Sequence, residues 1–301
     1  MTMPDVSQPD PSTAPCEPRF VIRNACLEAV FYPTAGGRMG CLRHFHYGHL
    51  LVPFPGSRLG LSQWPKAGAF PLFPFHNKLQ SATFNLEGRQ IRLKPNMTDG
   101  TTVMHGPAHR RAWHVSDNTE QHIELALDYK ADQDWPFDFR ATQRFELCRN
   151  QLTIALRLTN TGKVVMPGGI GWHPYFRASE SGQISLDAER QWDPFTANRS
   201  FKLARGNDVA PSPILELGRT HHYSGWKQAT ASIGDGARIA IEGHDALSYF
   251  AALHKEVYLC LEPVSHLAGA FSDIDGPFSN NGLRLLVPGE SCSGTAILSV
   301  S

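Results

Sequence analysis

The sequence predicts an all-β protein built as one large antiparallel sandwich, and three observations support that prediction. Apolar and polar residues alternate over several segments, most clearly over residues 122–129 and 152–158, and a period of two is typical of a strand with one buried face. The 26 glycines and 22 prolines exceed average usage and indicate many turns, hence many short strands. No long stretch carries a convincing helical repeat.

Strand candidates follow one another from residue 20 to residue 300. Every second residue is apolar from Ile123 to Tyr129 and again from Leu152 to Leu158, whereas residues 139–147 alternate less cleanly. Turn sequences such as Asn160-Thr-Gly162 and Pro288-Gly289 separate the candidates. The further candidates are residues 20–31, 89–94, 163–170, 237–243, 249–253, 256–262, 283–287 and 294–300.

The chain is predicted to form a single domain over residues 19–301, preceded by a disordered tail over residues 1–18. The tail is rich in proline and serine and has few residues that could join a core. No internal repeat and no linker divides the rest of the chain. Two long segments, residues 53–78 and 262–282, are rich in proline, glycine and aromatic residues, which favours ordered, functional loops.

Composition argues against several classes of function. The 28 basic residues balance 28 acidic residues, so no nucleic-acid partner is expected, because phosphate contacts need clustered positive charge. The longest strictly apolar runs span five residues, so no membrane-spanning segment is predicted. The N-terminus lacks the basic and apolar regions of a secretory signal, and the six scattered cysteines form no C-x-x-C motif; a cytoplasmic location with reduced thiols is expected.

Glu262 is the first candidate for chemistry. It shares one face of the predicted strand with Tyr258 and Cys260, and Pro263 follows it and ends the ladder. A carboxylate at the mouth of a buried strand has its pKa raised by loss of water, which suits a general base. A solvated strand-end glutamate, or one paired with an arginine, remains the structural alternative.

Two histidines and a polar pair lie in similar surroundings. His173 follows Trp172 in an aromatic segment, and an imidazole that titrates near neutrality suits a general acid or base. His105 precedes a Gly-Pro pair and could project into a cleft, and Asn77 and Lys78 could hydrogen-bond a polyol. A core histidine, a turn histidine and surface loop residues are the structural alternatives.

A metal site is the less favoured interpretation of the remaining histidines. His44, His46 and His49 have spacings that could suit a metal, as could the adjacent His221 and His222, but no glutamate follows at a fitting distance. The chain has no nucleophile elbow, no phosphate-binding loop and no zinc-protease motif.

Five segments, taken in order along the chain, resemble the aldose 1-epimerase (mutarotase) family, and the resemblance runs from about residue 20 to 300. The family's Pro-Leu-x-Pro-x-x-Asn-Arg segment, its His-Gly segment, its His-Pro-Tyr-Phe signature, its Glu-Pro segment and its closing Leu-x-Pro-Gly-Glu strand have counterparts here. These counterparts are PLFPFHNKL, MHGPAHRRAW, GGIGWHPYF, LCLEPVSHLAGAF and GLRLLVPGES.

The resemblance implies a β-supersandwich of the galactose mutarotase type and interconversion of the α and β anomers of a free aldose. Glu262 would be the general base that takes the O1 proton, and His173 the general acid that protonates the ring oxygen. His105 would bind and polarise the same region, and Asn77 and Lys78 would hold hydroxyl groups. The family uses no metal and no cofactor, so a small-molecule aldose is the only partner implied.

The sequence also departs from the family pattern. Lys78 stands where the family usually has an arginine, so the planar, bidentate guanidinium is lost. Thr220 stands near the position of an aspartate that commonly holds sugar hydroxyls, which places the substrate in doubt more than the chemistry. His221, His222 or Trp226 could line the pocket instead.

Aromatic and basic residues suggest how a sugar could be held. Rings that can stack on the apolar face of a pyranose are available near the candidate residues, namely Phe75, Trp172, Tyr175 and Trp64. Overall neutrality favours a neutral sugar, whereas Arg110, Arg111 and Lys78 could together form a pocket for a sugar phosphate.

The mechanism requires Glu262 and His173 to meet across one pocket, with the carboxylate ionised and the imidazole protonated at the same pH. We expect a pKa of about 4–6 for the glutamate and about 6.5–7.5 for the histidine. The alternatives are a non-catalytic carbohydrate-binding protein on the same fold, a metalloenzyme using His44, His46 and His49, and a lyase or hydrolase.

Overall fold

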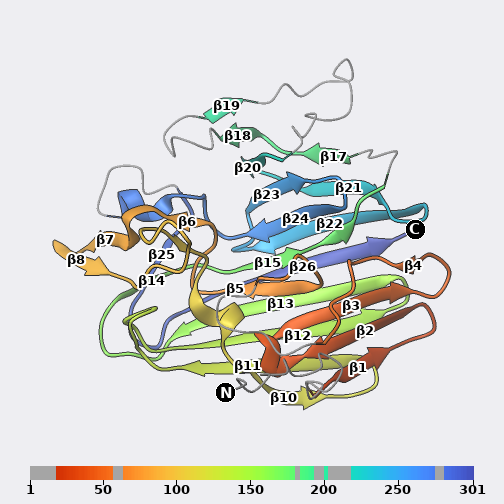
Figure 1. Ribbon diagram of the computed structural model, residues 1–301, viewed down its shortest axis with the longest axis horizontal. Coiled ribbons are helices and arrows are strands. Elements are labelled where there is room, and N and C mark those ends of the chain that lie inside the picture. Colours follow the sequence, from red (N-terminus) through yellow and green to blue (C-terminus); the bar gives the residue numbers. More distant parts are fainter. Residues whose placement is uncertain (1–17, 57–63, 180–183, 193–199, 203–217, 275–280) are drawn as a thin grey trace, which may run out of the picture.

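Antiparallel strands account for nearly all regular structure in the computed structural model (Figure 1). The model describes residues 18–56, 64–179, 184–192, 200–202, 218–274 and 281–301. The tail predicted over residues 1–18 therefore lies, except for Pro18, outside the described residues. Within them there is no α-helix, and no helix is long and apolar enough to cross a membrane. The predicted all-β, antiparallel fold is confirmed.

The larger of two main sheets has twelve strands. Two short strands flank its main path: β4 (Gly48–His49) pairs with β3, and β16 (Phe176–Arg177) pairs with β24. The path runs through β1 (Phe20–Arg23), β2 (Leu27–Tyr32), β3 (Arg38–His44), β5 (Ala69–Leu72), β15 (Gly171–Pro174), β24 (Tyr258–Val264), β23 (Tyr249–His254), β20 (Thr220–Ser224), β18 (Arg190–Trp192) and β19 (Ser200–Lys202).

The second sheet has eight strands and contains the longest ladders of the molecule. Its strands in spatial order are β10 (His114–Asn118), β11 (His122–Tyr129), β12 (Phe139–Cys148), β13 (Gln151–Asn160), β26 (Ser291–Val300), β22 (Ala237–Asp245), β21 (Gln228–Ile233) and β17 (Ile184–Asp187). Figure 1 shows this sheet stacked with the larger one.

Short elements complete the fold. Three two-stranded ladders pair β14 (Met166–Gly168) with β25 (Arg284–Leu286), β6 (Lys78–Leu79) with β9 (Val103–Met104), and β7 (Thr83–Leu86) with β8 (Arg89–Arg92). The single-turn 3₁₀ helices are η2 (Pro33–Ala35), η3 (Gln80–Ala82), η4 (Pro107–Arg110) and η5 (Ala270–Asp273).

The main core lies between the two sheets and follows from the alternating sequence. In β13 the residues at every second position, from Leu152 to Leu158, are buried, and their neighbours are largely exposed or half-buried. Phe31 of β2 and Phe145 of β12 meet across the sandwich with ring centroids 4.8 Å apart. Alternation thus supplies each sheet with one apolar face, and stacking removes both faces from water.

The centre of the larger sheet differs, because it is buried on both faces. Every residue of β5 and β15 is buried, and so are the six residues of β24 from Leu259 to Val264. A second apolar cluster, formed by Phe70, Leu72, Tyr175, Cys260 and Val264, covers the side away from the main core. Polar groups on that side are therefore removed from bulk water, which is the setting of the candidate site.

Several strand boundaries differ from the sequence prediction for local reasons. Residues 20–31 form two strands, because the Asn24 side chain accepts hydrogen bonds from the backbone N–H groups of Cys26 and Leu27 and turns the chain. The segment 53–78, predicted as a loop, contains the central strand β5, which is too short to carry a periodic signal. Of residues 163–170, predicted as a strand, only Met166–Gly168 is one.

Candidate active site

Two neighbouring strands bring His173 and Glu262 together. The strands β15 and β24 are adjacent in the larger sheet, with Gly171 opposite Val264. His173 Nε2 lies 3.4 Å from Glu262 Oε1, and the two residues are only 6% and 5% exposed. A buried imidazole and a buried carboxyl group in direct contact can exchange a proton with each other and with a third group placed beside them.

Gly171 allows this close approach of the two strands. A Cβ atom at this position would lie 2.8 Å from Cγ1 of Val264 and 3.2 Å from the backbone oxygen of Pro263. Such distances are shorter than normal van der Waals contact, so any larger residue would move β15 away from β24. The glycine two residues before His173 thus helps to set the distance between the imidazole and the carboxyl group.

Aromatic rings fix the orientation of His173. Phe70 lies opposite it in the ladder of β5 and β15, with ring centroids 4.6 Å apart and planes inclined at 28°. Tyr175 stacks on the same imidazole, with centroids 4.7 Å apart and planes at 26°. Stacking on two rings restricts rotation of the imidazole about its side-chain bonds, so its Nε2 stays directed at Glu262.

His105 occupies the next position in the site. Its ring centroid lies 5.5 Å from that of His173 and 4.8 Å from that of Trp64. The backbone N–H of Asn77 donates to Nδ1 of His105 over 3.0 Å, so the neutral ring carries its proton on Nε2. Burial, followed by the positive charge that His173 would carry, keeps the pKa of His105 well below its ordinary value. The ring is therefore a neutral donor.

The turn around His105 depends on the glycine that follows it. His105 itself has φ 55°, in the left-handed region. A Cβ atom on Gly106 would lie 2.1 Å from the backbone oxygen of Phe73, so only glycine fits between these two segments. The His-Gly-Pro sequence is thus explained by the turn that directs His105 towards His173.

Asn77 connects His105 to a further histidine. Its side-chain Oδ1 accepts a hydrogen bond from the backbone N–H of Lys78 at 2.7 Å, and its Nδ2 lies 3.4 Å from Nε2 of His222 on β20. Burial lowers the pKa of His222 to about 4, so this imidazole is neutral at neutral pH. Lys78 begins β6 and is exposed. Thr220, at the start of β20, is half-buried.

Two predicted aromatic contacts lie away from the dyad of His173 and Glu262. Trp172 points to the opposite face of β15 from His173, so it is fully buried in the main core. Its ring lies 6.4 Å from that of Phe176. Phe75 packs in the same core, 5.2 Å from the ring of Phe271. Trp226 also belongs to the core.

The protonation states differ from those expected from the sequence. Burial raises the pKa of Glu262 to about 8, although Lys66 partly opposes this, so the expected range of about 4–6 is wrong. Burial, followed by the charges of Lys66 and Arg38, lowers the pKa of His173 well below its ordinary value, so the expected range of about 6.5–7.5 is also wrong. Loss of water disfavours the charged form of each group. At neutral pH the dyad therefore carries one proton and no net charge.

Lys66 and Arg38 are site residues that the sequence analysis did not identify. The ammonium group of Lys66 lies 4.0 Å from the ring centroid of Trp64, a cation–π contact. The buried guanidinium of Arg38 donates to the backbone oxygen of Ala67 and lies 5.0 Å from the ring centroid of Phe70. Lys66 falls within the long segment predicted to be functional, which was the one available signal. Arg38 had none, because β3 was not predicted.

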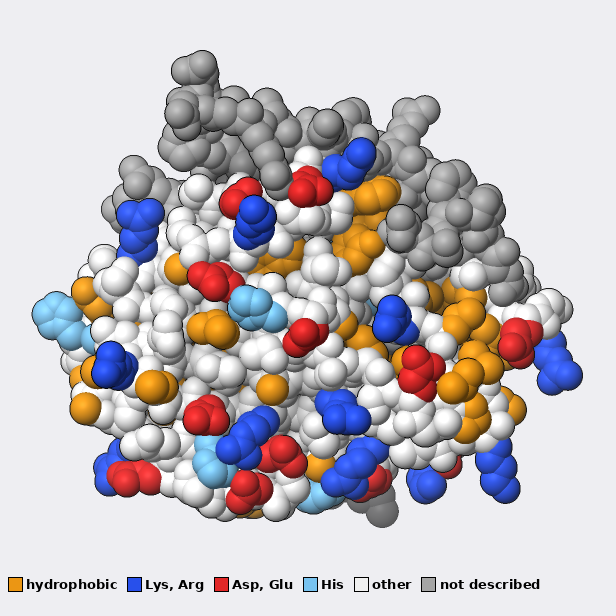
Figure 2. Space-filling model, turned by 180° about the vertical axis from the view of Figure 1, so that it is seen from behind, with side chains coloured by type: hydrophobic (Ala, Val, Ile, Leu, Met, Phe, Trp, Pro, Cys, Tyr) orange, Lys and Arg blue, Asp and Glu red, His pale blue; other side chains and the backbone are white. Residues whose placement is uncertain are grey.

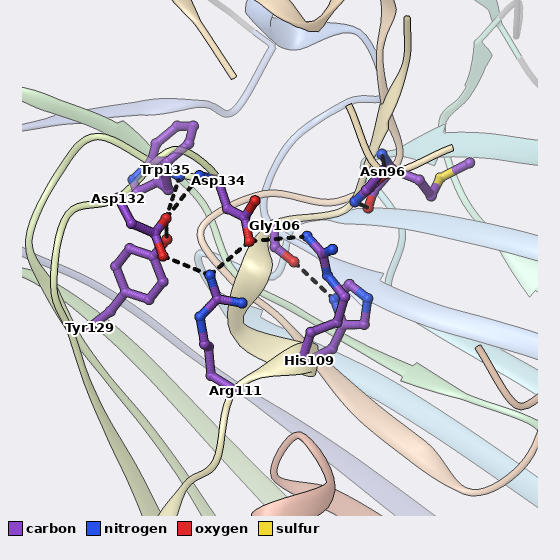
Figure 3. Close-up of polar contacts among 10 residues, drawn as sticks. Asn96, Gly106, His109, Arg111, Tyr129, Asp132, Asp134 and Trp135 are labelled. Atoms are coloured by element: carbon purple, nitrogen blue, oxygen red, sulfur yellow. Dashed lines mark hydrogen bonds and ion pairs between the residues drawn. The ribbon is translucent and has the colours of Figure 1, made fainter. Parts of the chain in front are cut away.

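The two adjacent arginines considered for phosphate binding are paired with acidic residues. Figure 3 shows Arg111 between the carboxylates of Asp132 and Asp134, with distances of 2.8 and 2.7 Å. Arg110 lies 3.8 Å from the same Asp134. Their charges are therefore largely neutralised within the protein. On the face of the molecule in Figure 2, basic and acidic side chains are interspersed.

The histidines considered as metal ligands are engaged in local contacts. Nδ1 of His44 accepts hydrogen bonds from the backbone N–H groups of His46 and Tyr47, and Nδ1 of His49 lies 3.2 Å from the Cys41 sulfur. In the described part of the chain, one group of three possible metal ligands converges, and it consists of His173, Cys260 and Glu262.

Comparison with known proteins identifies the fold and the family of the chain. A curated relative from Escherichia coli K12, the uncharacterized protein YphB, is 28% identical over 262 residues, which are 82% of this chain and 87% of that protein. A crystal structure from Escherichia coli K12, provisionally described as an aldose 1-epimerase, matches with a TM-score of 0.79 and 24% identity over 94% of this chain and 99% of the other.

A galactose mutarotase-like protein from Clostridium acetobutylicum matches with the same TM-score of 0.79 and 19% identity, over 94% of this chain and 95% of that chain. At such identities the structural matches establish the fold. The family model for aldose 1-epimerase matches residues 20–238, which is well over half of the 301 residues. The chain therefore belongs to the aldose 1-epimerase family.

Proposed function

We propose that this protein interconverts the α and β anomers of a free aldose by acid–base ring opening, with Glu262 as general base and His173 as general acid. One observation carries the proposal. The two groups are in contact at 3.4 Å in a buried site. Membership of the aldose 1-epimerase family supports the same reaction.

The reaction needs one proton removed and one supplied. Glu262 takes the proton from O1 of the cyclic hemiacetal while His173 protonates the ring oxygen, and the ring opens to the aldehyde. Rotation about the C1–C2 bond exposes the other face of the carbonyl group. On reclosure His173 removes the proton from the ring oxygen and Glu262 returns one to O1, so atoms and charge balance over the cycle.

The single shared proton fits this scheme. In the free site the proton resides on the carboxyl group, because burial disfavours both charged forms. Hydroxyl groups of a bound sugar can hydrogen-bond the carboxylate and stabilise its charge. The proton then moves to the imidazole, and the pair reaches the state with an ionised base and a protonated acid without exchanging a proton with solvent.

Other residues of the site are suited to holding a neutral polyol. His105 presents a neutral Nε2–H donor, which can polarise the oxygen atoms near the reacting carbon. The amide of Asn77 and the neutral imidazole of His222 can bind hydroxyl groups further from the dyad, and Lys78 can reach a hydroxyl group from the edge of the site. Tyr175 and Trp64 offer apolar ring surfaces beside the histidines.

A sugar phosphate is the second candidate substrate, and Lys66 is the observation that favours it. This ammonium group is near enough to Glu262 and His173 to influence the pKa of both. In the described part of the chain, this ammonium group has a cation–π contact with Trp64 and forms no ion pair with a carboxylate. The phosphate pocket first considered, from Arg110 and Arg111, is less suitable because Asp132 and Asp134 are bound to those arginines.

Magnetisation-exchange NMR over a panel of free and 6-phosphorylated aldoses tests the proposal. We expect accelerated anomer exchange with the wild-type protein and a fall in kcat of at least about a hundredfold in both Glu262→Gln and His173→Asn, because each change removes one proton-transfer partner. The exposed Glu256 and His244 provide matched controls, and Glu256→Gln and His244→Asn should retain full activity. Near-normal turnover in either dyad variant would refute the assignment.

A further inference from the structure

Cys260 adds a third ligand group to the dyad. It lies two residues before Glu262 on β24, so the two side chains leave the same face of the strand. The cysteine is fully buried against Phe70 and Tyr175, in the cluster that covers His173. One ligand atom from each of Cys260, His173 and Glu262 lies within 4.8 Å of both others.

Thiolate, imidazole and carboxylate are the ligands that Zn²⁺ prefers, and three protein ligands with one open position are typical of accessible zinc sites. Two ligand atoms of a tetrahedral zinc ion with ordinary bond lengths lie about 3.3 Å apart. Nε2 of His173 and Oε1 of Glu262 are already at 3.4 Å. To reach the usual zinc–sulfur bond length, the sulfur of Cys260 must move towards the other two ligand atoms by on the order of 1 Å at most.

The charges of the site also suit a divalent ion. A thiolate and a carboxylate together supply two negative charges, so one dication bound to Cys260, Glu262 and a neutral His173 forms a complex with no net charge. An uncharged complex tolerates both the low dielectric of the site and the nearby cations Lys66 and Arg38.

We propose that His173, Cys260 and Glu262 form a Zn²⁺ site in which the ion switches the enzyme off. The bound ion uses the lone pairs with which Glu262 and His173 would accept protons, and it occupies the space between the carboxyl group, the imidazole and the reacting sugar oxygens. Binding of the ion is independent of the reaction, whereas the inhibitory consequence rests on the proposed epimerase function.

Titration of chelator-treated protein with Co²⁺, a spectroscopic substitute for Zn²⁺, tests the site without measuring activity. We expect one equivalent to give the visible bands of tetrahedral Co²⁺ together with a thiolate-to-cobalt charge-transfer band. Cys260→Ala should lose the charge-transfer band and bind at least about tenfold more weakly, because even loss of an outer partner of a ligand costs 10- to 100-fold.

Two other cysteines provide matched controls. Cys292 is also buried but lies on β26, and Cys41 forms a thiol–imidazole pair with His49. Cys292→Ala and Cys41→Ala should keep the band. Circular dichroism establishes that each variant is folded, and Cys260→Ser replaces the alanine variant if that one is not. Absence of a charge-transfer band, or its persistence in the folded Cys260 variant, overturns the site.

The inhibitory role is tested by NMR exchange on the same proteins. Stoichiometric Zn²⁺ should abolish wild-type exchange and a chelator should restore it, while the exchange catalysed by Cys260→Ala, measured relative to its own metal-free rate, should need at least about tenfold more Zn²⁺ for inhibition. Undiminished exchange with zinc bound overturns the switch. If no aldose is turned over at all, the epimerase proposal fails, and the cobalt spectrum still decides the metal site.

Discussion

At the scale of single residues, burial decides which proton the site holds. In water the glutamate would be ionised and its charge would favour the imidazolium form of a histidine beside it, whereas here the carboxyl group is protonated and the imidazole neutral. The total number of protons is the same in both descriptions. The site thus keeps the one proton that anomerisation requires. The proton stays on the carboxyl group, where neither side chain is charged, until a polar substrate favours its transfer to the imidazole.

This protonation predicts a plateau in the pH profile of kcat/KM for the metal-free enzyme. Above the pKa of Glu262, about 8, the dyad loses its proton and no acid remains, so activity falls. Far below pH 6.5, His173 is protonated as well as Glu262. The dyad then has no base, so activity falls again. NMR exchange rates from pH 4 to pH 10, corrected for spontaneous mutarotation, measure both limbs.

Lys66 provides an internal check on the alkaline limb. Its charge lowers the pKa of Glu262, so Lys66→Met should move this limb to higher pH, whereas the exposed control Glu256→Gln should leave it in place. An alkaline limb that does not move in Lys66→Met, or a profile that rises above pH 8, contradicts the assignment of the shared proton.

At the scale of elements, the site depends on how closely three central strands pack. Phe70 of β5, His173 of β15 and Glu262 of β24 lie on consecutive strands, so their separation is fixed by hydrogen-bonded ladders and not by loops. Sites supported by strands are held more accurately than sites on loops. At Gly171 there is no room for a larger side chain between β15 and β24, so the separation of these two strands depends on this glycine.

We therefore expect Gly171→Ala to reduce kcat at least about tenfold, since a displacement of about 1 Å can cost as much as a hundredfold. The added methyl group would contact Val264 and Leu72 at 2.8 and 3.2 Å and force the strands apart. Gly88→Ala, in a turn with open space around it but φ +73°, is the control that destabilises without touching the site. Steady-state NMR exchange and thermal unfolding of both variants distinguish displacement of the strands from general instability. Equal kcat values for the two variants would argue against displacement as the cause.

At the scale of the whole molecule, the sequence predicted the architecture better than the surroundings of the site. Alternation and turns identified strands such as β11 and β13, because each long ladder has one buried face. The short strand β5, the buried Arg38 and the exposed Lys66 left no periodic signal. Trp172 was expected beside the sugar, yet the same alternation that predicts strands places Trp172 and His173 on opposite faces of β15.

Ring neighbours also explain why the pKa values could not be predicted. His173 stacks on Tyr175, two residues further along the chain, but also on Phe70, which comes from the neighbouring strand β5 and is far from it in sequence. The contact of Asn77 with His222 likewise joins segments 145 positions apart. Such distant contacts determine burial, and burial determines the protonation state.

Burial of several histidines predicts how the whole fold responds to acid. Burial lowers the pKa of each of six buried histidines, His173 among them, to about 3 for His109 and to about 4 for His222 and His266. The same direction holds for His76, His105 and His173. Below pH 6.5 the unfolded chain therefore binds protons that the folded chain does not, and the folded state loses stability as the pH falls.

We expect the free energy of unfolding to decrease steadily from about pH 6.5 to pH 4.5, by up to about 1.4 kcal/mol per pH unit for each such histidine. Glu262 acts in the opposite direction, because its folded pKa of about 8 makes the folded state the better proton acceptor over part of this range. Six histidines outweigh one glutamate, so the net slope remains that of the imidazoles.

His109→Gln isolates one contribution to that slope. The imidazole Nδ1–H donates to the backbone oxygen of Gly106 at 2.8 Å, and a glutamine amide can replace this donor without titrating. Denaturant unfolding between pH 4.5 and pH 7.5 should show a slope about one proton smaller in this variant, and an unchanged slope in His46→Gln, whose side chain is exposed. A wild-type stability that is flat across this range would mean that the buried histidines accept protons without unfolding, and the neutral, desolvated site on which the shared-proton mechanism depends would then be wrong.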